Sequence, residues 1–238
     1  MTETERLWPD GPLFRQAEHM KLTTDALLLA DFTGAGAKNG RGADLGCASG
    51  IVMLLMMQRE QRIRMTGFEL LPEAAGAARE NLRLNGMEGR GSIVSGDLRE
   101  TVRQFPTGSF DFVVFNPPYY RLGRGALPPE PGRALARSEI ETGLEDFCRA
   151  VAYLCRSGGR VYCCSKPERL AELSAVLQQN RMEPKRLRFV HSRPDRGANL
   201  LLLEAGRDGQ PGLAVEAPLF LTDGCGGESE EYRRICHR

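Results

Sequence analysis

Residues 44–50 read Asp-Leu-Gly-Cys-Ala-Ser-Gly, and this stretch joins an apolar strand to a helix through a turn of small residues. Small side chains at such a turn allow a ligand to approach the backbone amides at the helix amino terminus. The spacing matches neither the Gly-x-Gly-x-x-Gly of dinucleotide-binding folds nor the Gly-Lys-Ser/Thr of a Walker loop. Taken alone, a plain tight turn explains the stretch equally well.

Strand-like and helix-like segments alternate on both sides of this turn. The first expected strand ends at residue 46. Six more are expected at residues 62–69, 91–94, 110–115, 160–165, 187–190 and 200–204. Expected helices cover residues 25–32, 51–59, 72–85, 141–155 and 167–180. This alternation predicts an α/β fold with a doubly wound, mostly parallel sheet of seven strands and helices on both faces.

The chain divides into three expected segments. Residues 1–39 form a short N-terminal cap, residues 40–205 the α/β core, and residues 206–238 a C-terminal extension packed on the core. A total of 238 residues suits one large domain with a modest extension.

Composition excludes several classes of protein. The longest apolar run, residues 51–57, is far shorter than the roughly 20 residues of a spanning helix, and no secretory leader begins the sequence, so we expect a cytoplasmic protein and no membrane partner. Lys and Arg total 32 against 31 Asp and Glu, so any nucleic-acid contact must come from a local patch. The seven cysteines form no Cys-x-x-Cys pair and only three histidines are present, so no metal site is expected.

Polar residues follow the next two expected strands. Glu69 ends one strand, where a carboxylate can accept hydrogen bonds from both hydroxyls of a ribose, although a solvated glutamate is the alternative. Asp97 follows the next strand, where it can accept a hydrogen bond from an adenine amino group or simply cap a helix. Together with residues 44–50, these positions predict an adenosine-like ligand across the carboxyl edge of the sheet.

Asn116-Pro117-Pro118-Tyr119 comes directly after the strand at residues 110–115 and is the most specific motif of the chain. The two prolines fix the backbone, so the Asn116 side chain and the Pro117 carbonyl become rigid acceptors. Tyr119 offers an aromatic face for a planar group. Two acceptors on an amine whose lone pair is delocalised draw the nitrogen toward tetrahedral geometry, which favours transfer to that amine.

These motifs, in this order, resemble the class I S-adenosylmethionine-dependent N-methyltransferases, and among them the bacterial tRNA(Val) adenine N6-methyltransferases. Three further stretches are similar to that family: residues 20–29, the pair Arg133 and Arg137 after NPPYY, and the tail at residues 218–232. The resemblance implies a Rossmann-like sheet with an antiparallel last strand, S-adenosyl-L-methionine as cofactor, and methyl transfer to N6 of an adenine in RNA, with tRNA as the expected substrate. Ala48 stands where the family has a glycine, and alanine fits there if its φ is negative.

The resemblance also implies the site residues. The catalytic residues would be Asn116, Pro117, Pro118 and Tyr119. The cofactor would be bound by Thr24, Asp25, Asp44, Gly46, Cys47, Ala48, Gly50, Glu69, Leu70, Asp97 and Leu98. Weaker RNA contacts would come from Arg121, Arg124, Arg133 and Arg137, in a Gly- and Pro-rich loop after the catalytic motif.

Two alternatives to this function remain open. A glutamine N5-methyltransferase of the release-factor type shares Asn-Pro-Pro-Tyr, because an amide nitrogen has the same delocalised lone pair. A non-catalytic RNA-binding module of the same fold is the other. The sequence leaves the oligomeric state open.

Overall fold

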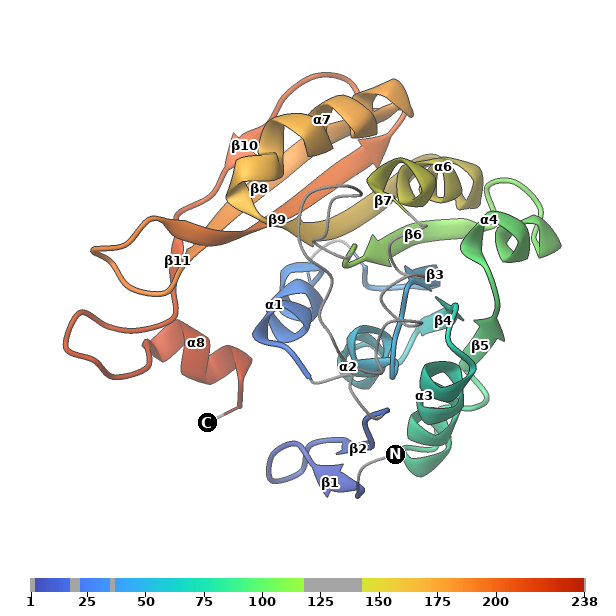
Figure 1. Ribbon diagram of the computed structural model, residues 1–238, viewed down its shortest axis with the longest axis horizontal. Helices are drawn as coiled ribbons and strands as arrows, with labels where there is room; N and C mark the ends of the chain where they lie inside the picture. The colour runs from blue at the N-terminus through green and yellow to red at the C-terminus, as the bar shows by residue number, and fades with distance from the viewer. Residues whose placement is uncertain (1–2, 18–21, 35–36, 118–142, 238) are drawn as a thin grey trace, which may run out of the picture.

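The computed structural model describes residues 3–17, 22–34, 37–117 and 143–237. In this part of the chain a nine-stranded sheet forms the centre of the molecule, with helices on both faces (Figure 1). The strand order is β10-β8-β9-β7-β6-β3-β4-β5, and β11 also pairs with β8.

Five neighbouring strands of the sheet are parallel. They are β3 (Gly40–Leu45), β4 (Ile63–Glu69), β5 (Gly91–Ser95), β6 (Phe110–Phe115) and β7 (Cys155–Ser165). The central strands are almost continuously apolar, because helices cover both faces of a parallel sheet. The predicted doubly wound α/β fold is confirmed.

Four further strands complete the sheet on the β7 side. They are β8 (Met182–His191), β9 (Ala198–Arg207), β10 (Ala214–Val215) and β11 (Leu219–Phe220). β9 runs antiparallel to both β7 and β8, which confirms the expected antiparallel last strand of the seven-stranded core. The two short strands from the C-terminal residues pair with the outer edge of β8. The limits of the three predicted segments remain predictions.

Side chains alternate between two hydrophobic clusters, as they must on a pleated strand. On β6, Phe112 and Val114 join the cluster under α1 and α2, whereas Val113 and Phe115 join the cluster under α6 and α7. The helices are α1 (Thr24–Phe32), α2 (Ile51–Arg59), α3 (Pro72–Leu84), α4 (Leu98–Thr101), α6 (Leu144–Leu154), α7 (Leu170–Gln179) and α8 (Glu230–Ile235). None of the described helices has the length and apolar character needed to cross a bilayer.

The strand β7 begins earlier than the sequence predicts. The sequence predicts a helix to residue 155 and a strand from residue 160, yet β7 already starts at Cys155 and runs through Ser157-Gly158-Gly159. Gly158 has a φ of 71°, and the register with β6 shifts between Phe110 and Phe112. A Cβ at Gly159 would lie 2.8 Å from the Asp111 carbonyl oxygen. Gly158 and Gly159 therefore allow the irregular backbone of β7 and its close approach to the backbone of β6.

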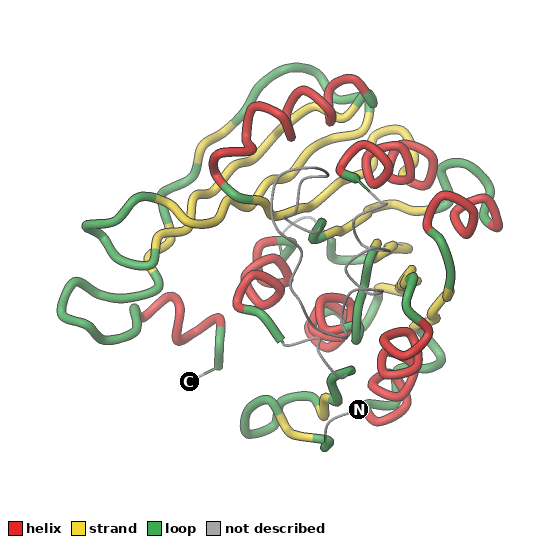
Figure 2. The backbone as a smooth tube through the Cα atoms, in the orientation of Figure 1, coloured by secondary structure: helices red, strands yellow, loops and turns green. Residues whose placement is uncertain are grey.

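The N-terminal hairpin of β1 (Glu5–Arg6) and β2 (Leu13–Phe14) lies near the chain's other end (Figure 2). The Trp8 ring stacks on the His237 imidazole with 4.2 Å between ring centroids. Both terminal segments therefore lie on the same side of the molecule.

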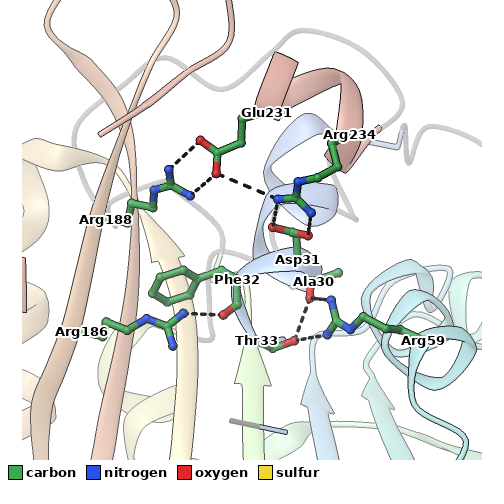
Figure 3. Close-up of polar contacts among 9 residues, drawn as sticks. All are labelled: Ala30, Asp31, Phe32, Thr33, Arg59, Arg186, Arg188, Glu231 and Arg234. Carbon is green, nitrogen blue, oxygen red and sulfur yellow. Dashed lines mark hydrogen bonds and ion pairs between the residues drawn. The ribbon is translucent and has the colours of Figure 1, made fainter. Parts of the chain in front are cut away.

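Arginine side chains close the carboxyl end of α1 (Figure 3). Arg59 of α2 donates to the Ala30 carbonyl at 2.9 Å and to the Thr33 hydroxyl at 3.0 Å. Arg186 of β8 donates to the Phe32 carbonyl at 2.6 Å and stacks over the Phe32 ring. Cations at this end complement the negative pole of the helix dipole and satisfy carbonyls that have no partner within the helix.

The C-terminal helix α8 is bound to the same region (Figure 3). Arg234 pairs with Asp31 of α1 at 3.4 Å. Glu231 accepts two hydrogen bonds from the Arg188 guanidinium, each at 2.8 Å, so α8 is also tied to β8. The C-terminal extension thus connects α1 to the edge of the sheet.

Candidate active site

The loops that follow β3, β4 and β5 meet at the carboxyl edge of the sheet. Gly46 and Cys47 both donate their backbone N–H to the Phe68 carbonyl near the end of β4, at 2.8 and 3.0 Å. Gly96, after β5, donates to the Glu69 carbonyl at 2.9 Å. Three of the predicted site segments are therefore in direct contact.

The turn from β3 into α2 needs left-handed backbone at three positions: Gly46 (φ 68°), Ala48 (φ 50°) and Gly50 (φ 79°). A Cβ at Gly50 would lie 3.2 Å from the Ala78 Cβ of α3, so the turn also packs tightly on its neighbour. The condition under which alanine would fit this position, a negative φ, is not met. A left-handed conformation costs a residue with a Cβ roughly 1–2 kcal/mol, and this turn retains that strain.

Glu69 is buried at the end of β4 and locked in place by backbone amides. One carboxylate oxygen accepts from the Ala48 N–H at 2.8 Å, and the other accepts from the Leu71 N–H at 2.9 Å. A carboxylate oxygen has two lone pairs and can take part in more than one hydrogen bond. The geometry permits the predicted ribose contact, which remains a prediction, as does the role of Leu70 beside it.

Asp44 is fully buried beneath the turn, and desolvation raises the pKa of its carboxyl to about 7. The nearby Glu69 charge raises this pKa further, while a hydrogen bond from the Met53 amide lowers it. Among the described residues, no donor bonds to its Oδ2. An unpaired buried carboxylate oxygen is costly, and it suits a site that receives a ligand donor.

Asp97 acts as the N-cap of α4. Its Oδ1 accepts from the Arg99 amide at 2.8 Å, and the Arg99 guanidinium pairs with the carboxylate. This pairing holds the pKa of Asp97 below its usual value. The helix-cap alternative therefore describes the side chain as it stands, whereas the adenine contact remains a prediction. Leu98 follows as the buried first residue of α4.

Asn116 follows β6 at the same edge of the sheet, and Pro117 beside it is buried. The Cys164 thiol of β7 donates to the Asn116 Oδ1 at 3.1 Å. This contact orients the side-chain amide, because a thiol donor selects the oxygen rather than the NH₂ group. The rest of the predicted motif, Pro118 and Tyr119, lies outside the described residues.

Of the other predicted site residues, some lie in the described part of the chain and some lie outside it. Thr24 and Asp25 form the first turn of α1 and are half-buried, and their cofactor role stays a prediction. The four arginines proposed for RNA contact lie outside the described residues: Arg121, Arg124, Arg133 and Arg137. In the described part of the chain, no group of three or more His, Cys, Asp or Glu side chains could hold a metal ion.

The sequence reasoning missed the residues that fasten the N-terminal segment to the cofactor turn. The Ser49 hydroxyl accepts from the Ala17 N–H at 3.0 Å. Asn81, buried in α3, donates to the Ser49 and Arg15 carbonyls and accepts from the Arg15 N–H. In the sequence, the one indication of this role was that Asn81 is a polar residue on the apolar face of α3.

Comparisons with known proteins agree with this geometry. Residues 19–125 match the family described as Methyltransferase small domain. A tRNA1(Val) (adenine(37)-N6)-methyltransferase of Porphyromonas gingivalis is 30% identical over 190 residues, which cover 78% of this chain and 74% of the relative. The chain belongs to the tRNA1(Val) (adenine(37)-N6)-methyltransferase family. This confirms the predicted resemblance and the expectation of an enzyme.

Another relative in this methyltransferase family, from Aeromonas salmonicida, is 28% identical over 221 residues, covering 92% of this chain and 89% of the relative. Among solved structures, a predicted O-methyltransferase from Agrobacterium tumefaciens has a TM-score of 0.72 at 24% identity, covering 90% of this chain and 96% of its own. A geranyl diphosphate methyltransferase in complex with SAM has a TM-score of 0.56 at 15% identity, covering 76% of this chain and 84% of its own. At these identities the structures establish the methyltransferase fold alone.

Proposed function

We propose that this protein transfers a methyl group from S-adenosylmethionine to the N6 amine of an adenine in tRNA. Membership of the family supports this function, because the names of its curated relatives specify that reaction. The observation that carries the proposal is the placement of Glu69 and Asp44 around one tight turn, at the same sheet edge as Asn116.

The residues at the turn suit the cofactor. Two backbone amides immobilise the Glu69 carboxylate, an acceptor of the kind that binds ribose hydroxyls, and the Asp44 Oδ2 can accept from a further donor of the ligand. Gly46 is exposed at the turn and has no side chain, so a ligand can approach its backbone closely. We assign Ala48 and Gly50 to the same turn of the cofactor site. We assign the remaining cofactor contacts to Cys47, Leu70, Asp97, Leu98, Thr24 and Asp25. When bound, S-adenosylmethionine supplies a methyl group made electrophilic by its sulfonium centre.

Asn116 and the Pro117 carbonyl would bind the two N–H groups of the target amine. Their acceptor oxygens favour the amine as it becomes tetrahedral, so they stabilise the transition state more than the bound substrate. The nitrogen forms a bond to the methyl carbon, the carbon–sulfur bond breaks with its electrons on sulfur, and the amine loses a proton to solvent. Pro118 would fix the backbone, and Tyr119 would stack on the adenine.

The adenine must leave its base stack to reach this edge, as nucleobase methyltransferases require. Arg121, Arg124, Arg133 and Arg137 follow the proposed catalytic motif in the sequence, and we assign them contacts to phosphates around the target base.

The decisive experiment incubates the purified protein with labelled S-adenosylmethionine and either total tRNA or a peptide release factor. The modified product is identified by mass spectrometry. N6-methyladenosine in tRNA supports the proposal, and methylglutamine in the release factor would replace it with the alternative reaction. Failure to bind S-adenosylmethionine at all would leave only a non-catalytic module.

Two variants test the assigned roles. Asn116→Ala should slow the single-turnover methylation rate on the order of a hundredfold and leave cofactor affinity intact. Asn39→Ala makes the same change at an exposed position at the opposite edge of the sheet, so its rate should match the wild type. Glu69→Gln should weaken cofactor binding by roughly 1–3 kcal/mol, measured by titration calorimetry. A wild-type methylation rate for Asn116→Ala would refute the mechanism.

A further inference from the structure

A cavity of about 230 Å³ opens at the amino ends of β3, β4 and β5. It lies at the opposite edge of the sheet from Asn116, about 20 Å away by the length of a six-residue strand. Arg41 and Arg64 line it together with Thr66 and Ser92. None of these residues takes part in the proposed methyl transfer.

Two arginine side chains line this cavity, and the Asp111 carboxylate accepts from the Arg41 backbone N–H at 2.8 Å. Arg41 of β3 and Arg64 of β4 are register partners on adjacent strands. Both side chains are exposed, and their guanidinium groups contact opposite neighbours, Phe110 of β6 and the Gly89 carbonyl before β5. Among the described residues, no carboxylate lies within ion-pair distance of either guanidinium, whereas Arg160, Arg186 and Arg188 each pair with a glutamate.

Both guanidinium groups are held in place while keeping donors for a ligand. Arg64 donates to the Gly89 carbonyl at 2.7 Å, which uses one of its five N–H groups. Arg41 stacks over the Phe110 ring, 5.5 Å from its centroid. Arg90 adds positive charge at the cavity wall, and its own donors bind backbone carbonyls, among them Ile63 and Met57.

Hydroxyl groups complete the lining. The Thr66 Oγ1 and the Ser92 Oγ are 3.1 Å apart on register partners of β4 and β5. Hydroxyls and guanidinium groups are the donors that bind phosphate oxygens in proteins. Glu88, also in the lining, can accept from hydroxyls of the sugar attached to such a phosphate.

We propose that this cavity binds the phosphate group of a nucleotide, with Arg41 and Arg64 as its charged donors. Two sources share this chemistry: a free nucleotide and a phosphodiester of an RNA backbone. The site is separate from the proposed methyl-transfer site, so a ligand here leaves the cofactor turn accessible.

The test titrates the full-length protein with AMP by calorimetry and with a short single-stranded RNA at several salt concentrations. The double variant Arg41→Gln/Arg64→Gln should lose at least tenfold in AMP affinity if the ligand is a free nucleotide. If the ligand is an RNA backbone, its RNA affinity should fall and the salt slope should decrease by roughly 0.7 per lost phosphate contact. S-adenosylmethionine affinity should stay at the wild-type value in both cases.

A matched control, Arg103→Gln/Arg149→Gln, removes the same charge from exposed positions outside the cavity and should bind both probes like the wild type. Ser92→Ala, which keeps both arginines, should weaken the same probe by a few-fold. Wild-type binding of both probes by Arg41→Gln/Arg64→Gln, or an equal loss in the control, would overturn the proposal. So would a wild-type protein that binds neither probe.

Discussion

Replacing Ala48 by glycine should stabilise the protein, because Ala48 holds a left-handed backbone conformation with a φ of 50°. That conformation costs a residue with a Cβ roughly 1–2 kcal/mol and costs glycine almost nothing. Glycine gives back roughly 0.5–1 kcal/mol through the greater freedom of the unfolded chain. The net expectation for Ala48→Gly is about 1 kcal/mol of added unfolding free energy.

Urea unfolding of the cofactor-free protein measures this difference, with the m-value unchanged if only stability shifts. Ala171→Gly is the matched control, since Ala171 is exposed within helix α7 and the same substitution there should lose about 1 kcal/mol. The two variants should therefore move in opposite directions. If Ala48→Gly destabilises the protein as much as Ala171→Gly does, the strain assigned to the turn is wrong.

Three other predictions concern buried groups. Tyr162→Phe should leave the unfolding free energy unchanged or raise it by about 1 kcal/mol, because no described donor or acceptor bonds to the buried Tyr162 hydroxyl. Urea unfolding measures the change, and a loss of stability would contradict the prediction. The unfolding free energy of Asp44→Asn should rise relative to that of the wild type between about pH 4 and about pH 7, and the difference should stay constant above pH 7. Burial raises the pKa of the folded Asp44 carboxyl from 3.8 to about 7, so the wild type loses the stability of its protonated carboxyl over that range. Parallel curves of unfolding free energy against pH for the two proteins would refute this prediction. Cys164→Ala should slow single-turnover methylation a few-fold without changing cofactor affinity, because the Cys164 thiol orients Asn116. Cys164→Ser should retain the wild-type methylation rate. Equal rates for the wild type and both variants would exclude that role.

Local sequence signals placed most of the core elements correctly. The helix predicted at residues 51–59 matches α2 residue for residue, and the strand predicted at residues 110–115 matches β6. Proline at the first turn set the start of α3 at Pro72. These elements were predictable because their apolar pattern and their end signals lie within the same few residues.

Other features depend on contacts that no local pattern encodes. The strand β8 was predicted only from residue 187, and a proline such as Pro184 is unusual inside a regular strand. In the structure β8 starts at Met182, and a register shift between Pro184 and Arg186 accommodates the proline. Asn81 likewise binds Arg15, which is 66 residues away, and the helical period reveals only that position 81 faces inward.

At the site, residue types were more predictable than conformations. The carboxylates and glycines at the strand ends were found from their positions after apolar runs. The φ of Ala48 was not, because the turn around it is fixed by bonds to Glu69 and Phe68 on the next strand. The Cys164 contact to Asn116 joins two strands 48 residues apart and had no signal in the sequence.

The arginines around α1 also set the order in which the molecule can be completed during synthesis. Arg186 binds Phe32 across 154 residues, and Arg234 pairs with Asp31 across 203. At about 5–20 residues per second, a ribosome needs roughly 10–40 s to make the chain between Asp31 and Arg234. Before Arg186 is made, Arg59 of the neighbouring α2 is the arginine that binds the carboxyl end of α1 among the described residues. One of the first helices to be made therefore receives its last ion pair only when the chain is nearly complete, and a chain released a few residues early lacks the Asp31–Arg234 pair.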